Sequence, residues 1–295
     1  MKHRVMILGT NGMLGSMLVR RWHEQSTFDL FAGVRGAVAP ELGAGLKACL
    51  TGLDASDFGK PLQAQLAAFM RQNSIDTVVN CMGLIKQRAG GQDPVQAIAI
   101  NALFPHQVAQ VCAAERTRLI HISTDCVFSG DKGSYRETDI PDASDFYGRS
   151  KALGEVGAPY LTLRTSIIGP ELESAGGLGL MAWLFRQKGP TVPGYSRAIF
   201  SGVTTLTLAD LISDVIQGGA DIAGLFHVAS SPIDKFSLLE AINRIFGLGL
   251  KVVADAALNI DRSLDASKIQ ASLGYRPPTW DDQLGVLAEF VNKKT

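Results

Sequence analysis

Residues 5–15 read Val5-Met6-Ile7-Leu8-Gly9-Thr10-Asn11-Gly12-Met13-Leu14-Gly15, and this stretch decides the fold. The apolar run 5–8 is typical of a strand buried on both faces. After the glycines, apolar residues recur at helical spacing through Met17, Leu18 and Trp22. Strand, glycine turn and helix in this order predict a dinucleotide-binding turn, because glycine lets the backbone approach a pyrophosphate and a helix N-terminus offers free amides. We therefore expect cofactor contacts from Gly9, Thr10, Asn11, Gly12, Met13, Leu14 and Gly15; the alternative is a tight turn that only packs helix on strand.

Apolar segments alternate with helical patterns up to residue 166, which predicts a doubly wound parallel sheet, a Rossmann-like α/β fold. We expect further strands at 28–34, 46–53, 75–80, 119–122 and 161–164. Beyond them, glycine and proline interrupt the pattern. There we expect a helix over 206–216, a strand at 226–228, a helical hairpin over 236–246 and a C-terminal helix from 279. The predicted division is a cofactor domain, 1–166 plus about 203–229, and a smaller interleaved substrate-binding region, about 167–202 plus 230–295.

The ends of the early strands carry candidate contacts for the rest of a dinucleotide. An acidic residue after the second strand typically bonds the ribose diol of NAD, whereas an arginine pairs with the 2′-phosphate of NADP. This chain has Arg35 there, which favours NADP(H), with NAD(H) and a merely solvated arginine as alternatives. Asp54 is a candidate contact for the adenine end. Cys81, Met82 and Gly83 form a small-residue exit where a ribose fits.

A second pattern, farther along the chain, suits carbonyl chemistry. Tyr147 and Lys151 are four residues apart, so a helix places them on one face. A nearby ammonium favours the phenolate, and we expect Lys151 to lower the pKa of Tyr147 toward neutrality. A hydroxyl from the preceding strand end, Thr124 or Ser123, can hold the carbonyl oxygen. Taken alone, the pattern is also compatible with an ordinary tyrosine on a surface helix.

Composition excludes several classes of protein. The 295 residues contain 46% hydrophobic and 19% charged residues, and Lys plus Arg equals Asp plus Glu at 28 each, so no overall charge recruits nucleic acid or a membrane surface. The four cysteines form no C-x-x-C and the five histidines have no metal-ligand spacing, so we expect reduced thiols and no metal site. We find neither a convincing signal peptide nor a run of 18 apolar residues, and expect a cytoplasmic protein.

Taken together, these motifs resemble the extended short-chain dehydrogenase/reductase family, and within it the dTDP-4-dehydrorhamnose reductases. The resemblance spans the chain and is carried by Gly9-x-x-Gly12-x-x-Gly15, the blocks 123–130 (STDCVFSG), 147–155 (YGRSKALGE) and 164–166 (RTS), and 264–268 (LDASK) followed by Gly274. It implies that Tyr147 is the proton donor, Lys151 its electrostatic partner and a nicotinamide-ribose contact, and Thr124 the hydrogen-bonding hydroxyl. It also implies that Asn101, in a helix where a polar residue more often faces solvent, supports a proton relay, and that the protein forms a homodimer.

The chain departs from that family near the expected sugar. Cys126 stands where the rhamnose reductases usually have tyrosine, Ser129 where they have aspartate, and Ile167 where they have an aromatic residue. We expect the segment 191–201 to be a substrate-facing loop whose Arg197 contacts phosphate, because its fork of donors suits phosphate oxygens. A packed aromatic residue is the alternative for Trp183. The expected substrate contacts are Lys86, Val127, Phe128, Ser166, Trp183 and Arg197.

The predicted function is NADPH-dependent reduction of the 4-keto group of a nucleotide-linked 6-deoxyhexulose, for cell-surface polysaccharide synthesis. One alternative is a sugar-nucleotide epimerase that keeps NAD tightly bound. The other is a non-catalytic, NADP-binding regulatory subunit, since a fold alone does not fix a function. The sequence leaves the sugar, the nucleoside and the stereochemistry of the product open.

Overall fold

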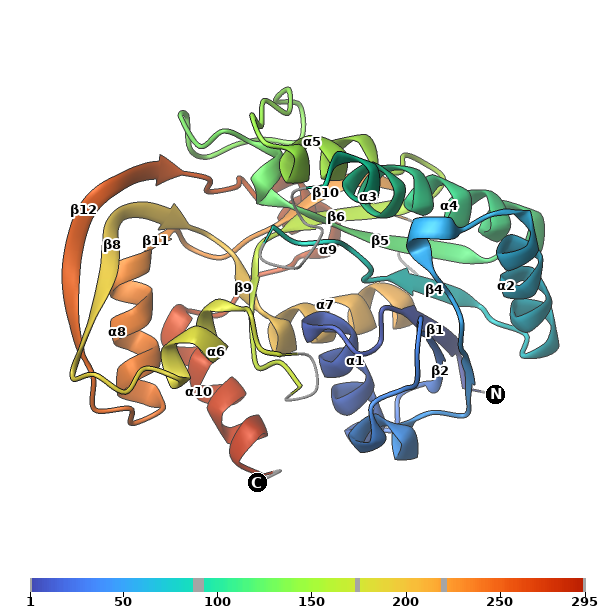
Figure 1. The fold of residues 1–295 in the computed structure, drawn as a ribbon, viewed down its shortest axis with the longest axis horizontal. Coiled ribbons are helices and arrows are strands. Elements are labelled where there is room, and N and C mark those ends of the chain that lie inside the picture. Colours follow the sequence, from blue (N-terminus) through green and yellow to red (C-terminus); the bar gives the residue numbers. More distant parts are fainter. Residues whose placement is uncertain (1, 87–92, 173–175, 219–221, 294–295) are drawn as a thin grey trace.

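The computed structural model describes residues 2–86, 93–172, 176–218 and 222–293. A seven-stranded sheet runs through the larger half of the molecule in the order β10-β6-β5-β4-β1-β2-β3 (Figure 1). Every pairing in this sheet is parallel. Its strands are β1 Arg4–Leu8, β2 Asp29–Gly33, β3 Ala48–Leu50, β4 Thr77–Asn80, β5 Arg118–Thr124, β6 Leu161–Thr165 and β10 Gly224–Val228. The predicted doubly wound fold is confirmed, and the direction of winding reverses between β1 and β4, where such sheets bind ligands.

Helices cover both faces of the sheet because the central strands are buried on both sides. In β1, Val5 and Ile7 contribute to one core cluster and Met6 and Leu8 to the other. One face carries α1 Met13–Glu24 and α7 Thr205–Gln217, and the other carries the remaining helices of this half (Figure 1). These are α2 Lys60–Gln72, α3 Pro94–Ala97, the π-helix η3 Ile98–Leu103, α4 Phe104–Glu115 and α5 Phe146–Leu153, with the short 3-10 turns η1 Pro40–Gly45, η2 Ala55–Asp57 and η4 Asp125–Val127 along the connections.

The helical stretch Pro94–Glu115 has the length and apolar composition of a membrane span, which the sequence pattern did not predict. Core helices of proteins without any span can have the same composition. In this fold the stretch lies on the sheet, with its inward side chains in the core: Ala97, Phe104, Val108, Val111 and Cys112.

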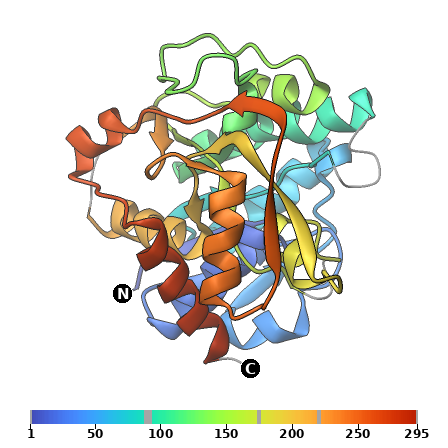
Figure 2. The same cartoon turned by 90° about the vertical axis from the view of Figure 1, so that its left-hand side faces the viewer.

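The smaller half is built on a three-stranded sheet of order β11-β8-β12, with β8 Thr191–Phe200, β11 Ile233–Asp234 and β12 Lys251–Asp261. Helix α8 Lys235–Ile245 packs on this sheet, with α10 Trp280–Asn292 beside it (Figure 2). The other elements are α6 Leu180–Phe185, α9 Ser267–Leu273 and a two-stranded sheet of β7 Ile167–Ile168 and β9 Val203–Thr204.

Three expectations for this half are wrong. The segment 191–201 is mostly a strand and not a loop, because Val192, Gly194, Ala198 and Phe200 alternate toward the interior. Strand β12 was not predicted, since its side chains are largely exposed and show no apolar alternation. The expected hairpin at 236–246 is the single helix α8, which begins at a carboxylate: Asp234 accepts a hydrogen bond from the amide of Ser237.

Candidate active site

The glycine turn after β1 has no room for side chains. Gly9 has a φ of +81°, and a Cβ there would lie 3.0 Å from the Met82 side chain. A Cβ on Gly15 would lie 2.3 Å from the Gly9 carbonyl oxygen. Gly12 precedes α1 without a side-chain cap, so the first amides of the helix face the turn. The turn is therefore a cradle of backbone donors that fits a pyrophosphate.

The side chains of the other residues in this turn mainly contact the protein itself. The Thr10 hydroxyl donates to the Ile7 carbonyl at 2.7 Å. The Asn11 amide donates to the Ala37 carbonyl at 2.8 Å, which holds the loop after β2 against the turn. Leu14 is buried in the core, and Met13 is partly buried. From these residues only the backbone and the edge of Met13 are available to a cofactor.

Arg35 lies exposed directly beyond β2, close enough to Asp54 to influence its carboxylate. The amide and hydroxyl of Ser56 donate to Asp54 at 2.9 and 2.7 Å. These bonds, with the charge of Arg35, hold the pKa of Asp54 below its usual value. The exposed Arg35 side chain stands at the position where an NADP phosphate is expected.

The exit of β4 adjoins the π-helix and α5. A Cβ on Gly83 would lie 3.5 Å from Asn101 Oδ1 and 3.9 Å from Lys151 Nζ. Asn101 accepts from the Leu84 amide at 2.8 Å and donates to the Leu84 carbonyl at 3.0 Å and to Ser150 Oγ at 3.1 Å. The general expectation that this polar residue faces solvent is wrong: Asn101 is fully buried and ties the β4 exit to the helix of Lys151. A π-helical turn at such a position is common in functional sites.

Cys81 and Met82 complete this exit. The Met82 amide donates to Asn80 Oδ1 at 3.1 Å, and its side chain lies against Gly9. Burial raises the pKa of the Cys81 thiol to about 12, although Lys151 lowers it. Cys81 is therefore a neutral thiol at the floor of the site.

Tyr147, Lys151 and Thr124 meet at the carboxyl end of β5. Helix α5 begins at Asp145, whose carboxylate accepts from the Gly148 amide at 2.8 Å. The Thr124 hydroxyl lies close enough to the Tyr147 phenol to favour its ionised form. Lys151 Nζ donates to the Ile122 carbonyl at 2.7 Å. The arrangement places two hydroxyls together and an ammonium one helical turn away, a set suited to protonating a carbonyl oxygen.

The expected lowering of the phenol pKa is wrong for this structure. Burial raises the pKa of Tyr147, with further contributions from the Cys126 thiol and two aspartates, and the Thr124 hydroxyl only partly offsets them. Burial also lowers the pKa of Lys151 to about 8, although the carboxylate of Glu155 raises it. The effect of burial on the Tyr147 pKa exceeds any lowering by the Lys151 ammonium, so the phenol stays protonated.

Ser123 does not share the role of Thr124. Its hydroxyl donates to Glu155 Oε1 at 2.6 Å. Arg164 also pairs with Glu155, through contacts of 2.8 and 2.6 Å, and reaches His227 at 3.0 Å. Burial and the charge of Arg164 lower the pKa of His227 to about 3, so the imidazole is neutral. Ser123 belongs to this buried network below the site.

The expected substrate residues divide into three groups. Lys86 lies at the site: its ammonium pairs with Asp145 at 2.5 Å and lies 5.7 Å from the centre of the Tyr147 ring. Ser166 is also close, near enough to Asp125 to favour the ionised form of its carboxyl group. Trp183 is partly buried against the core, and Arg197 is exposed on β8. The prediction for the Val127 and Phe128 side chains is wrong.

Val127 and Phe128 are fully buried in the core. The Phe128 ring stacks on Tyr135 with a centroid separation of 4.0 Å, and the Arg164 guanidinium lies 4.9 Å from the centre of the Phe128 ring. The motif of these two residues lies next to the site in sequence, but their side chains are taken up by core packing.

Two basic residues from the smaller half were not anticipated. Lys235, at the start of α8, acts electrostatically on Asp125 and Cys126. Arg262 donates to the Phe128 carbonyl at 2.9 Å and lies 3.6 Å from Cys126 Sγ. Isolated basic residues carry no spacing signal, and only the chain fold brings these two to the residues that follow Thr124.

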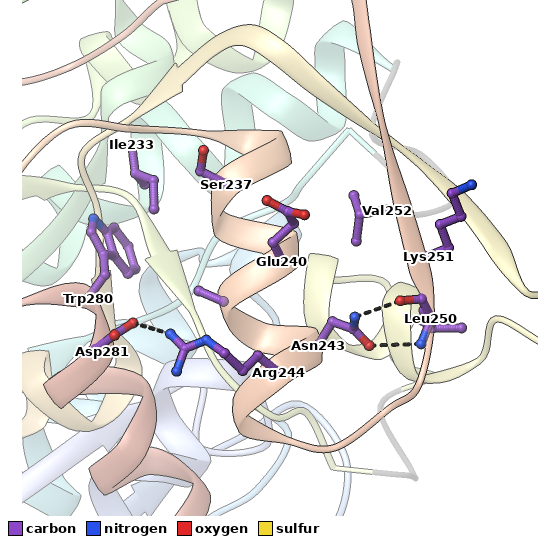
Figure 3. Close-up of a pocket in the computed structure, with 11 residues that line it drawn as sticks. Ile233, Ser237, Glu240, Asn243, Arg244, Leu250, Lys251, Val252, Trp280 and Asp281 are labelled. Carbon is purple, nitrogen blue, oxygen red and sulfur yellow. Dashed lines mark hydrogen bonds and ion pairs between the residues drawn. The ribbon is translucent and has the colours of Figure 1, made fainter.

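A cavity of about 840 Å³ lies elsewhere, between α8, the start of β12 and the start of α10 (Figure 3). Two of its polar side chains are held by contacts within the lining. Asn243 exchanges hydrogen bonds of 2.7 and 2.9 Å with the Leu250 backbone, and Arg244 pairs with Asp281 at 2.6 Å. The cavity contains none of the catalytic candidates. No group of three or more metal-ligating side chains occurs in the described ranges.

Comparison with known proteins agrees with this geometry. Residues 2–292 match the family described as RmlD substrate binding domain. The probable low-salt glycan biosynthesis reductase Agl14 of Haloferax volcanii is 29% identical over 307 residues, covering 95% of this chain and 96% of that protein. The dTDP-4-dehydrorhamnose reductase of Bacillus anthracis in complex with NADP has a TM-score of 0.76 at 21% identity, covering 99% of this chain and 100% of the other. The Bordetella bronchiseptica enzyme WbmG in complex with NAD has a TM-score of 0.78 at 19% identity, covering 99% and 95%.

Proposed function

The chain belongs to the RmlD substrate binding domain family, and on that premise we propose that it reduces the 4-keto group of a nucleotide-linked 6-deoxyhexulose with NADPH, in the synthesis of cell-surface polysaccharide sugars. The observation that carries the proposal is the placement of the Thr124 hydroxyl near the Tyr147 phenol at the end of β5, with Lys151 one helical turn from Tyr147 on α5. A protein that only binds a dinucleotide needs none of these three groups.

The residues act on the carbonyl oxygen. Thr124 and Tyr147 donate hydrogen bonds to it, and Tyr147 transfers its proton as the oxygen gains negative charge. Because the pKa of Tyr147 is raised, the phenol holds this proton at neutral pH. Lys151, charged below about pH 8, stabilises the phenolate that remains. A bound reduced nicotinamide supplies the hydride.

The glycine cradle supports a dinucleotide, and the exposed Arg35 supports NADP(H) over NAD(H). In this proposal residues 1–166 plus about 203–229 bind the cofactor, and about 167–202 plus 230–295 bind the sugar nucleotide. Arg197 and Trp183 are proposed contacts for phosphate and base. The four free thiols are consistent with a reducing, cytoplasmic location.

We also propose a homodimer, through the outer face of the helices that carry Asn101 and Tyr147. Residues 94–114 contain no Asp, Glu, Lys or Arg. The large apolar side chains exposed on this face are Val95, Ile98, Leu103, Phe146 and Leu153. Apart from Arg149, which is exposed between Phe146 and Leu153, this surface is apolar and suits a twofold contact, in which each patch meets its own copy.

The test is a panel of dTDP-, UDP- and GDP-linked 4-keto sugars, with NADPH consumption and the identity of the alcohol as readouts. Tyr147→Phe should lower kcat by about 10²–10⁴-fold, because it removes the proton donor. Binding of NADPH should be unchanged. Tyr160→Phe is the matched control and should keep full turnover, because the Tyr160 hydroxyl donates to the Ala109 carbonyl at 2.9 Å and not to a catalytic candidate. Full turnover by Tyr147→Phe would remove this residue from the mechanism.

Two alternatives have distinct outcomes in the same experiments. An epimerase would purify with tightly held NAD and would not consume NADPH. A regulatory subunit would bind NADPH stoichiometrically and turn over none of the sugars. The arrangement of Thr124, Tyr147 and Lys151 favours catalysis over a role in binding alone, and the exposed Arg35 favours NADPH over tightly held NAD.

A further inference from the structure

Lys235 occupies an unfavourable place for a cation. It is the first residue of α8, directly after the cap Asp234, where the helix dipole disfavours positive charge. The side chain is partly buried, and Nζ lies 3.7 Å from the centre of the Phe200 ring. Burial lowers the pKa of its ammonium to about 8. Keeping a lysine here costs stability, which suggests a role outside folding.

The ammonium also lacks a conventional partner. Within the described ranges, no carboxylate lies within salt-bridge distance of Lys235 Nζ and no acceptor within hydrogen-bond distance. Arg262 differs, because it donates to the Phe128 carbonyl at 2.9 Å. Aromatic contact satisfies a cation only in part, since it provides no acceptor for the three N–H groups.

The groups opposite Lys235 belong to the catalytic centre. Its charge acts on Asp125 and Cys126, the two residues after Thr124. Asp125 accepts a hydrogen bond of 3.2 Å from the Thr124 hydroxyl. The Phe200 ring under the ammonium lies beside Ser166, because a Cβ on Gly202 would be 2.3 Å from Phe200 Cζ and 2.2 Å from the Ser166 carbonyl oxygen. The Lys235 ammonium and the Asp125 side chain thus lie near each other without touching, beside the Thr124 hydroxyl. An acceptor and a donor separated in this way match one sugar hydroxyl, which donates to the first and accepts from the second.

We propose that Lys235 is a substrate-positioning residue that binds, together with Asp125, the ring hydroxyl next to the reacting carbonyl of the hexose. The inference rests on the proposed function and narrows the substrate class: the sugar carries a free hydroxyl at C3. Lys235 then holds the sugar so that its C4 oxygen reaches Thr124 and Tyr147.

The experiment pairs a substitution at Lys235 with removal of the hydroxyl. In Lys235→Met, KM for the 4-keto sugar should rise about 10–100-fold, the loss expected for a hydrogen bond to a charged donor, with a smaller change in kcat. NADPH affinity should be unchanged. The melting temperature should stay or rise, because an apolar side chain replaces a desolvated cation on Phe200. A purely structural lysine would show the reverse, a lower melting temperature and an unchanged KM.

Lys268→Met is the matched control. Lys268 also lies over an aromatic ring, 4.1 Å from the centre of Phe226, and its ammonium donates to the Leu225 carbonyl. These contacts lie away from the catalytic candidates, and its substitution should leave KM unchanged. A rise in KM equal to that of Lys235→Met would mean that losing any such cation impairs the protein, and would overturn the proposal.

Calorimetric binding of dTDP-glucose and dTDP-3-deoxyglucose tests the hydroxyl without turnover. The wild-type protein should bind the 3-deoxy ligand about 10–100-fold more weakly, and Lys235→Met should bind both alike. Equal wild-type affinities, including no measurable binding of either ligand, would overturn the inference even if NADPH is consumed. If the wild-type protein prefers dTDP-glucose over the 3-deoxy ligand but reduces none of the 4-keto sugars, the contact of Lys235 with the hydroxyl is supported and the proposed reaction is refuted.

Discussion

Arg164 and Lys235 are two cations near the residues that follow Thr124, and their surroundings differ. On the β6 side, Arg164 is 1% exposed and pairs with Glu155 and His227, while Ser123 completes the carboxylate's shell. On the α8 side, Lys235 has an aromatic ring and a distant carboxylate. The guanidinium of Arg164 thus has its hydrogen-bond partners within the protein, whereas the N–H groups of Lys235 have none among the described residues.

This difference reflects what each side has to do. Groups that fix a catalytic side chain work best when the protein itself holds them, because no reorganisation is then needed during the reaction. Groups that select a substrate must leave hydrogen-bonding capacity for it, and they carry the cost of desolvation until it binds. We infer that the β6 side orients Lys151 through β5 and that the α8 side recognises the sugar.

The largest effect on stability is expected from breaking the buried ion pair between Arg164 and Glu155. Glu155→Gln keeps the shape of the side chain but leaves Arg164 buried without a counter-charge, which should cost about 3–5 kcal/mol of unfolding free energy. Urea denaturation measures the loss. The control is Asp281→Asn, which breaks the exposed pair with Arg244 and should cost about 0–1 kcal/mol. Similar losses in both variants would show that Arg164 does not depend on its partner.

A smaller effect tests how firmly α5 is held on the β6 side. A Cβ on Gly148 would lie 2.2 Å from the Cys126 carbonyl oxygen, whereas a Cβ on Gly285, inside α10, meets nothing within 4 Å. Gly148→Ala should destabilise the protein by about 1–3 kcal/mol and reduce turnover, because the helix of Tyr147 must shift. Gly285→Ala should stabilise it by about 0.5–1 kcal/mol, since alanine favours a helix. The same sign for both variants would contradict the close contact at Gly148.

The β6 side was also the more predictable from sequence. Its strands are short apolar runs and its candidate residues have fixed spacing, so Gly9, Gly15, Thr124, Tyr147 and Lys151 could be proposed from the sequence, and the fold brings Thr124 and Lys151 to the end of β5. What spacing could not predict was desolvation: the separation of Tyr147 and Lys151 suggests a lowered phenol pKa, and burial reverses it. Nor did the motif 123–130 reveal which side chains turn inward, and so Val127 and Phe128 were misassigned.

The α8 side gave weaker signals for a physical reason. Strand β12 exposes most of its side chains, and β8 combines proline and glycine with its alternation, so neither has the apolar pattern of a central strand. Arg262 reaches Cys126, and Lys235 acts on Asp125 and Cys126 through its charge, only because the fold brings together residues more than 100 positions apart in the chain. A pattern within one segment cannot report such contacts.

The dependence of activity on pH also separates the two sides. Burial lowers the pKa of both Lys151 and Lys235 to about 8. The raised pKa of Tyr147 keeps the phenol out of this range. Above about pH 8, kcat/KM should therefore fall, approaching a hundredfold per pH unit when both ammonium groups are lost. In Lys235→Met the fall should approach tenfold per unit, because only Lys151 still titrates.

The same lysines fix the sign of the stability change. Between about pH 8 and their ordinary value of 10.5, the unfolded chain holds protons that the folded protein has released. Unfolding free energy should accordingly rise over this window through these two groups, while activity falls. Lys235→Met should reduce the rise, because only Lys151 then contributes to it. Because loss of activity by unfolding would require stability and activity to fall together, opposite trends in the wild-type protein would assign the alkaline loss to the two ammonium groups.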